Sequence, residues 1–320
     1  DWRALSRAVK LSYSGDVILK GQDITWARIE PALPPPGLAG RVDALALAAP
    51  PLRPWLRDPW LCAKPRDQWP ARFRKAKVRC SDGEWQRVRE GLYARGIIDF
   101  LPAGDLIWHH GEPLLNGVFG VPKGEVGSPG FDPLTCWLRL IIQAMPTNEV
   151  QNPLIAEIED LPLFTLWMLL ELLPKEQYLV SSEDQLCSFY LYYLPKEWLP
   201  WFVLGKERTA PISGVPESHT WPAVRVPAMG WRSAANLFQH LHSQLARAAA
   251  LRLPSVDLPS WLGRTTTPAA LDELGRIVNF IQIYLDNWDK GRLVRALDAS
   301  KLAGEIGPLQ RALREVFYEW

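Results

Sequence analysis

The chain has 320 residues, enough to bury one large hydrophobic core or two smaller ones, so one or two domains are expected. Hydrophobic residues make up 48% and charged residues 22%, which is typical of a folded, soluble protein. The net charge of +1 excludes a global attraction to nucleic acid, so any such role would depend on local patches. The 29 prolines and 16 tryptophans, often in Pro-x-Trp contexts, predict a loop-rich chain with aromatic anchors.

The cysteines argue against a structural metal. No two of them stand at the spacing of a zinc site, and no His is near enough to complete one. We therefore expect reduced thiols in an intracellular protein at Cys62, Cys80, Cys136 and Cys187.

No stretch of the sequence predicts a membrane segment. From the first residues we expect no signal peptide. The most apolar stretch, residues 161–173, is too short to span a bilayer and predicts a buried helix. Because the chain starts at Asp1 instead of Met and stops at Trp320 inside a helical pattern, we expect a fragment of a longer product.

The first 80 residues carry few regular patterns. Residues 1–60 show no clear period, and the proline-rich run at 31–37 predicts a stiff, extended linker. Residues 64–79 then set a cluster of cations against Asp67, which is suited to neutralising phosphates, although a solvated basic face explains it equally well. The cations are Lys64, Arg66, Arg72, Arg74, Lys75, Lys77 and Arg79.

Local signals predict alternating helices and strands after residue 80. Ser81 and Glu84 predict the N-terminal cap of a helix that ends at Gly96. Short strands are expected at 97–101 and 106–108, and strands at 116–123 and 137–142 predict a hairpin. Residues 150–173 are expected to be mostly helical, 178–180 a strand, and 227–250 a loop and then a long helix. Residues 271–284 are expected to begin as helix and end as an apolar strand, and the tail from 291 to 320 to contain an amphipathic helix.

Two aspartates stand where an apolar strand gives way to a turn. Asp184 follows the strand at 178–180, and Asp286 follows the apolar run that ends at Tyr284. If the two strands are neighbours in one sheet, both carboxylates lie at the same end, as a two-metal phosphoryl-transfer site requires. Ordinary turn chemistry explains either aspartate taken alone.

Five motifs, in order and including both aspartates, give the chain its resemblance to the reverse transcriptases of retroelements. Residues 116–123 (Asn-Gly-Val-Phe-Gly-Val-Pro-Lys) resemble a fingers strand, and residues 138–141 (Leu-Arg-Leu-Ile) with the Pro-Thr-Asn at 146–148 resemble the rest of the fingers hairpin. Residues 182–190 resemble motif A, Pro-Ala-Met-Gly-Trp at 227–231 resembles motif B, and Tyr-Leu-Asp-Asn at 284–287 resembles motif C. The resemblance covers roughly residues 85–320.

The resemblance implies roles for individual residues. Asp184 and Asp286 would bind two Mg²⁺ or Mn²⁺ ions, with Asn287 completing the catalytic set. Lys123 and Arg139 would hold the triphosphate of a deoxynucleotide, although solvated cations remain an alternative.

Six aromatic or motif B positions carry further expectations. Phe189 would stack under the sugar and exclude a 2′-hydroxyl, or would be a core aromatic. Met229 and Gly230 would line the nucleotide site, where Gly230 lets the backbone approach the nascent base pair. Trp231 and Phe238 are expected to pack, and Gln239 to face the template or solvent.

The fold expected from the resemblance is α+β, with the fingers and palm of a right-hand polymerase and an antiparallel palm sheet packed on helices. Residues 1–80 would form a proline-rich extension of unknown function. Residues 81–320 would form fingers and palm with the thumb missing or incomplete. The partners implied are an RNA or DNA template with its primer and deoxynucleoside triphosphates, without a membrane.

The sequence departs from the family at motif C, where Asn287 replaces a second aspartate, and in the fingers, where Gln143 and Met145 replace an acid and a base. Asn keeps an oxygen ligand but loses a charge. Three hypotheses follow. The chain is an RNA-directed DNA polymerase, a degenerate relative that still binds nucleic acid without catalysis, or a Trp- and Pro-rich interaction protein.

Overall fold

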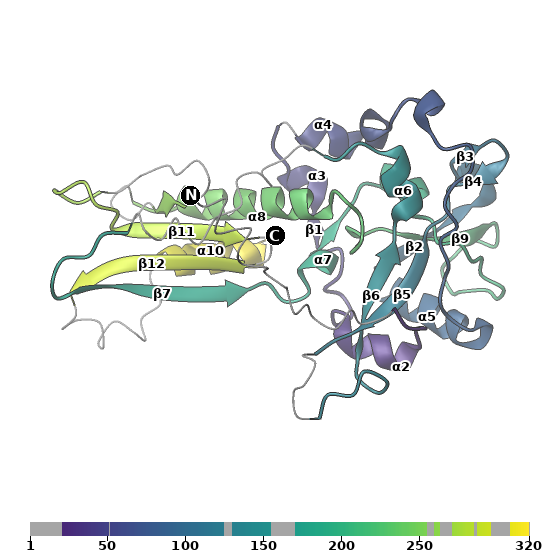
Figure 1. The fold of residues 1–320 in the computed structure, drawn as a ribbon, viewed down its shortest axis with the longest axis horizontal. Helices are drawn as coiled ribbons and strands as arrows, with labels where there is room; N and C mark the ends of the chain where they lie inside the picture. Colours follow the sequence, from purple (N-terminus) through teal and green to yellow (C-terminus); the bar gives the residue numbers. More distant parts are fainter. Residues whose placement is uncertain are drawn as a thin grey trace, which may run out of the picture.

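The computed structural model describes residues 21–50, 52–124, 130–154, 170–254, 259–262, 271–284, 287–295 and 308–319. Figure 1 shows two regions side by side: a long sheet with helices along it on the left, and a more compact group of short elements on the right. The fold mixes helices with small sheets, most of whose strand pairs are antiparallel.

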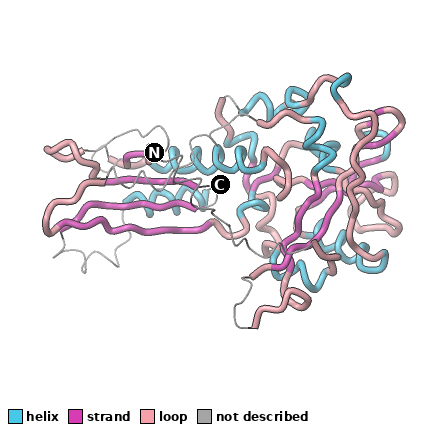
Figure 2. Tube along the Cα trace, viewed as in Figure 1, coloured by secondary structure: helices cyan, strands magenta, loops and turns pink. Residues whose placement is uncertain are grey.

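The long sheet has four strands in the order β10-β11-β12-β7. They are β7 (Glu176–Asp184), β10 (Ser260–Trp261), β11 (Asn279–Tyr284) and β12 (Asn287–Arg295). Strand β12 pairs antiparallel with both β11 and β7, and the short edge strand β10 runs parallel to β11. The predicted antiparallel sheet is therefore present, with one parallel edge, and its strands run side by side in Figure 2.

Two amphipathic helices cover this sheet. In α8 (Ala234–Ala250) the buried residues Leu237, Leu241 and Leu245 recur every four positions and so form one apolar stripe. Helix α10 (Pro308–Glu319) buries Leu313 and Val316 in the same hydrophobic core. The long helix and the amphipathic helix predicted from the sequence are both confirmed.

The compact region is built around the hairpin of β5 (Gly117–Pro122) and β6 (Leu138–Gln143), which pair antiparallel as the sequence predicts. Helix α5 (Asp82–Ala94) begins at Ser81, whose side chain accepts a hydrogen bond from the Glu84 N–H, as predicted. The other elements of this region are α6 (Met145–Val150), α7 (Ser188–Leu191), β1 (Val42–Asp43) paired with β8 (Tyr192–Tyr193), β2 (Ile98–Pro102) paired with β9 (His219–Val224), β3 (Trp108–His109) paired with β4 (Glu112–Pro113), and the short helices α2 (Trp26–Ile29), α3 (Ala44–Leu47), α4 (Leu52–Arg57), η1 (Glu30–Ala32), η2 (Pro59–Cys62), η3 (Arg66–Gln68), η4 (Ala103–Asp105) and η7 (Lys196–Phe202).

Segments from before residue 80 flank the hairpin. Gln22 and Gly120 exchange backbone hydrogen bonds of 2.8 and 2.9 Å, and the Arg79 N–H donates to the Val118 carbonyl at 2.8 Å. Buried residues on both sides of position 80, such as Leu52 and Leu237, belong to one hydrophobic core. The division at residue 80 stays a prediction.

Two local predictions are wrong. The run at 31–37 is no extended linker, because Pro31 lies in the 3-10 helix η1 and Leu33 is buried. Residues 271–278 are not helical, since the Asp272 carboxylate accepts the N–H groups of Leu274 and Arg276 and forms a turn with Gly275 at φ 75°.

The helix expected over 150–173 is wrong at its two ends and stays a prediction between them. Residues 155–169 lie outside the described residues, but 151–154 and 170–173 are not helical. Leu172 and Leu173 are 48% and 41% exposed and not buried as expected, and Pro174 disfavours helix at the residue before it.

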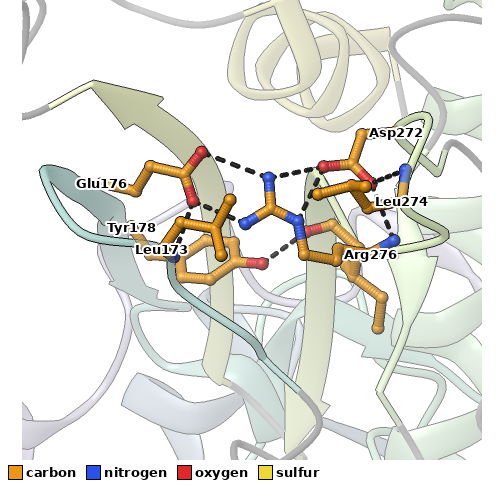
Figure 3. A network of polar contacts seen from close by, with 7 residues as sticks. Leu173, Glu176, Tyr178, Asp272, Leu274 and Arg276 are labelled. Carbon is orange, nitrogen blue, oxygen red and sulfur yellow. Dashed lines mark hydrogen bonds and ion pairs between the residues drawn. The ribbon is translucent and has the colours of Figure 1, made fainter.

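An ion-pair network fixes the end of the sheet farthest from Asp184. The Arg276 guanidinium donates to both carboxylate oxygens of Glu176, at 2.6 and 3.1 Å, and to Asp272 at 2.8 Å (Figure 3). The Tyr178 hydroxyl donates to the Ile277 carbonyl in the same place. Because Glu176 and Tyr178 begin β7 while Asp272 and Arg276 precede β11, the network holds the start of β7 against the entry to the β11–β12 hairpin.

Candidate functional site

Asp184 is the last residue of β7, and its backbone partner is Asn287, the first residue of β12. Asn287 also pairs with Tyr284, the last residue of β11. Leu285 and Asp286 connect Tyr284 to Asn287, and both lie outside the described residues. The motif A strand and the motif C hairpin are therefore neighbours in one sheet, with their ends in register at Asp184 and Asn287.

Two neighbouring carboxylates, Glu183 and Asp184, end strand β7, and the ion pairs of Glu183 distinguish it from Asp184. Glu183 lies 3.0 Å from Lys290 Nζ and 3.8 Å from Arg314, which tie β7 to β12 and to α10. Burial lowers the pKa of Lys290, and the hydrogen bond to Glu183 opposes this shift. Since successive side chains alternate along a strand, Asp184 projects from the other face, where it is exposed.

The strand that leads into motif C is held from behind by α8. Gln239 donates a 2.9 Å hydrogen bond from Nε2 to the Ile283 carbonyl, and Ile281 and Ile283 are buried. Gln239 is itself only 3% exposed, so the expectation that it faces template or solvent is wrong. A buried amide bonded to a strand carbonyl fixes β11 immediately before the turn that contains Asp286.

The two cations of the fingers hairpin project from its exposed face. Arg139 on β6 pairs with Val121 on β5, and the Lys123 N–H donates to the Trp137 carbonyl at 2.8 Å. Both cationic side chains are exposed. Burial raises the pKa of the Cys187 thiol, and the positive charge of Lys123 opposes that rise.

Phe189 makes a packing contact. It lies in α7, partly buried, with its ring centroid 4.3 Å from that of Phe238 and the planes tilted by 48°. Phe238 is 1% exposed, so its predicted packing role is confirmed. The alternative of a core aromatic is thus observed for one face of Phe189, and its contact with a sugar stays a prediction.

Met229 and Gly230 form a loop that packs on the fingers strand β6. The Ile142 N–H donates to the Met229 carbonyl at 2.9 Å. Gly230 has φ 115°, and a Cβ at this position would lie 3.3 Å from the Ile142 carbonyl carbon and closer still to its oxygen. Glycine is therefore required here by backbone conformation and by the approach of β6, while an approach to a base pair stays a prediction.

The sequence reasoning missed the residue that joins this loop to the fingers. Asn148 in α6 donates from Nδ2 to the Gly230 carbonyl at 3.0 Å and accepts the Arg232 N–H at 2.8 Å. The only local signal was the Pro-Thr-Asn triplet at the close of the hairpin. Trp231, which is 4% exposed, packs against Trp198 and Phe202, as its predicted packing role requires.

Within the described residues, no group of three or more His, Cys, Asp or Glu side chains is placed to hold a metal ion. Asp184 is the predicted metal ligand that belongs to this part of the chain, whereas Asp286 falls outside it. In the same part of the chain, no helix combines the length and apolar character needed to cross a membrane.

No protein-family model matches the sequence, and a search of curated proteins finds no match. Among solved structures, the foamy viral protease–reverse transcriptase dRH in complex with double-stranded DNA is similar, with a TM-score of 0.45 and 13% sequence identity. The match covers 88% of this chain and 34% of that protein, so the chain spans about a third of its length.

Proposed function

We propose that the chain is the fingers and palm of an RNA-directed DNA polymerase of a retroelement, which adds deoxynucleotides to a primer 3′ end. The observation that carries the proposal is the register between Asp184 and Asn287 at the turn of the β11–β12 hairpin. A carboxylate at a strand end beside a strand-turn-strand bearing a second carboxylate is the arrangement that two-metal nucleotidyl transfer uses.

The donor set suits hard cations. Asp184, Asp286 and Asn287 offer only oxygen ligands, which Mg²⁺ and Mn²⁺ prefer. Two such ions, when bound, would supply activation of the primer hydroxyl and stabilisation of the leaving pyrophosphate. Asn287 contributes an amide oxygen without a charge, so the site would hold these ions less tightly than one with a third carboxylate.

The remaining residues would bind and orient the nucleotide. Lys123 and Arg139 extend from the exposed face of the hairpin, where they would meet the triphosphate, Arg139 as a two-pronged donor and Lys123 as a point charge. Phe189 would lie under the sugar, and the loop of Met229 and Gly230 would border the base. Template and primer would lie across the sheet, held through their backbones.

A second function is favoured by one observation. The residue in register with Asp184 is Asn287, so the described end of the hairpin supplies an amide where the reverse-transcriptase pattern has a carboxylate. A chain that binds primer and template without extending the primer would account for this. Incorporation in Mg²⁺ and in Mn²⁺ separates the two functions.

The test is primer extension on an RNA template by the purified chain and by Asp184→Ala and Asp286→Ala. Each substitution should abolish extension while near-ultraviolet circular dichroism stays unchanged. Asp105→Ala, an exposed aspartate in η4, is the matched control and should extend normally. Asn287→Asp should raise extension in Mg²⁺ relative to Mn²⁺.

Extension that survives either alanine substitution at Asp184 or Asp286 would refute the assignment of the site. If neither cation supports extension by the wild-type chain or by Asn287→Asp, while primer–template binding falls steeply with salt, the non-catalytic function stands instead.

A further inference from the structure

The basic segment at 64–79 forms part of a groove remote from Asp184. A groove of about 610 Å³ is lined by residues 72–78, by Glu112 and Pro113 of β4, and by Gly205 and Lys206. Figure 1 shows β3 and β4 at the far end of the molecule from the sheet of β7 and β12. The groove is thus a second surface, separate from the candidate polymerase site.

The lining of the groove carries an excess of positive charge. Five cations line it against one carboxylate, Glu112: Arg72, Arg74, Lys75, Lys77 and Lys206. Three of these cations are within ion-pair distance of an acid, with Arg72 near Glu112, Arg74 near Glu149, and Lys206 near Asp82. Among the described residues, no carboxylate lies within ion-pair distance of the exposed Lys75 or Lys77. Even with Glu149 and Asp82 included, five cations face three carboxylates.

Aromatic rings continue from this groove onto the neighbouring surface. Phe73, which lines the groove, has its ring centroid 6.0 Å from that of Trp69, and Trp69 stacks parallel to Trp60 at 6.5 Å. Trp60 is 48% exposed, as is Trp108 on β3. The Arg66 guanidinium lies 4.2 Å from the ring of the buried Trp69 and 5.2 Å from that of Trp60, and it donates to the backbone carbonyl of Trp108, so the chain at Trp60 and at Trp108 is held to the same cluster.

A charged groove that ends on exposed aromatic rings is suited to a polymer that carries both phosphates and unstacked flat rings. Phosphates meet Lys and Arg, and bases that are not paired in a duplex can stack on Trp. A duplex offers only its phosphates to such a surface, because its bases are already stacked. We propose that the groove at residues 72–78 and the rings of Trp60 and Trp108 bind single-stranded nucleic acid.

The test is fluorescence anisotropy with a labelled oligothymidylate of about 20 nucleotides, longer than the ~4–16 nucleotides that one such surface covers. Lys75→Gln with Lys77→Gln should reduce the slope of log affinity against log salt by about 1.4, or about 0.7 for each phosphate that the protein no longer neutralises. Trp60→Ala should weaken binding roughly five- to a hundredfold, because a base can no longer stack on the ring. Trp108→Ala repeats the stacking test at a separate ring if the Trp60 variant does not fold.

The matched control is Lys175→Gln with Arg295→Gln, which removes two exposed cations at the far end of the β7–β12 sheet and should leave the slope unchanged. Asp184→Ala should bind the oligonucleotide as the wild type does, so failure of the polymerase proposal and failure of this one give different results. The proposal is overturned if the Lys75 and Lys77 substitutions leave the salt slope unchanged. It is also overturned if duplex DNA or polyglutamate competes as well as the single strand.

Discussion

Gly230→Ala tests whether the motif B glycine is needed by the fold itself. Gly230 has φ 115°, in a region that side chains with a Cβ rarely adopt. An added Cβ would also lie closer to the Ile142 carbonyl oxygen than the 3.0 Å that Cβ atoms keep from other atoms. We therefore expect the substitution to destabilise the protein in the absence of any nucleotide or nucleic acid.

The magnitude follows from these two effects. Holding a residue with a Cβ in a sparsely populated backbone conformation costs about 1–3 kcal/mol. Relieving the overlap with β6, whose Ile142 N–H is bonded to Met229, costs a further ~1–3 kcal/mol. The loop gives way in part, so a total of about 2–4 kcal/mol is expected, which is large for a single substitution at an exposed position.

The assay is urea unfolding followed by tryptophan fluorescence. With a slope of about 3 kcal/mol per molar urea, the expected loss lowers the midpoint by roughly 1 M. Gly104→Ala is the control, because Gly104 lies in η4 without a positive φ and a Cβ there would meet nothing within 4 Å. An unchanged midpoint for Gly230→Ala would refute the packing explanation, and loss of extension at full stability would assign the glycine to the nucleotide.

Two further predictions concern polar contacts. Asn148→Ala removes two hydrogen bonds to the motif B loop and should lower the free energy of unfolding, measured in urea, by about 1–2 kcal/mol. Asn152→Ala, at an exposed neighbouring position, should leave the free energy of unfolding almost unchanged. Equal losses in the two variants would contradict the role of Asn148. The hydrogen bonds of Arg276 lower the pKa of the Glu176 carboxyl, so its contribution to stability is present above the unfolded value of 4.5 and is lost as the pH falls through the lower folded value. Arg276→Met should therefore flatten the decline of the unfolding free energy below about pH 4.5, measured by urea titrations at several pH values, and an unchanged decline would exclude this ion pair as its source.

Local signals in the sequence predicted the elements that surround the site. The cap at Ser81, the hairpin strands and the amphipathic stripe of α8 follow from residues within a few positions of each other, and these elements are observed. The apolar run before Tyr284 was also predicted as strand, and it forms β11. Such features are predictable because neighbouring residues along the chain determine them.

The contacts that hold the site together were not predictable in this way. Gln239 and Ile283 are 44 residues apart in sequence, and Arg276 and Glu176 are 100 apart, so no local pattern records either hydrogen bond. Asn148 reads as an ordinary polar residue after a proline until the motif B loop is seen against it. The helix predicted over 271–278 was wrong for a related reason. The helix-forming residues of this run favoured helix, and no local pattern indicated that the Asp272 side chain would bind the N–H groups of Leu274 and Arg276.

The structure also separates motif residues that the fold explains from those that it does not. Gly230 is accounted for by the approach of β6, and Phe189 has a packing partner in Phe238, so neither requires a nucleotide. Lys123 and Arg139 are different, because both are exposed and no carboxylate of the described chain lies within ion-pair distance of either. Two exposed cations on one face of a hairpin contribute little to stability. Folding therefore does not explain either cation, and the binding of a triphosphate by Lys123 and Arg139 stays a prediction.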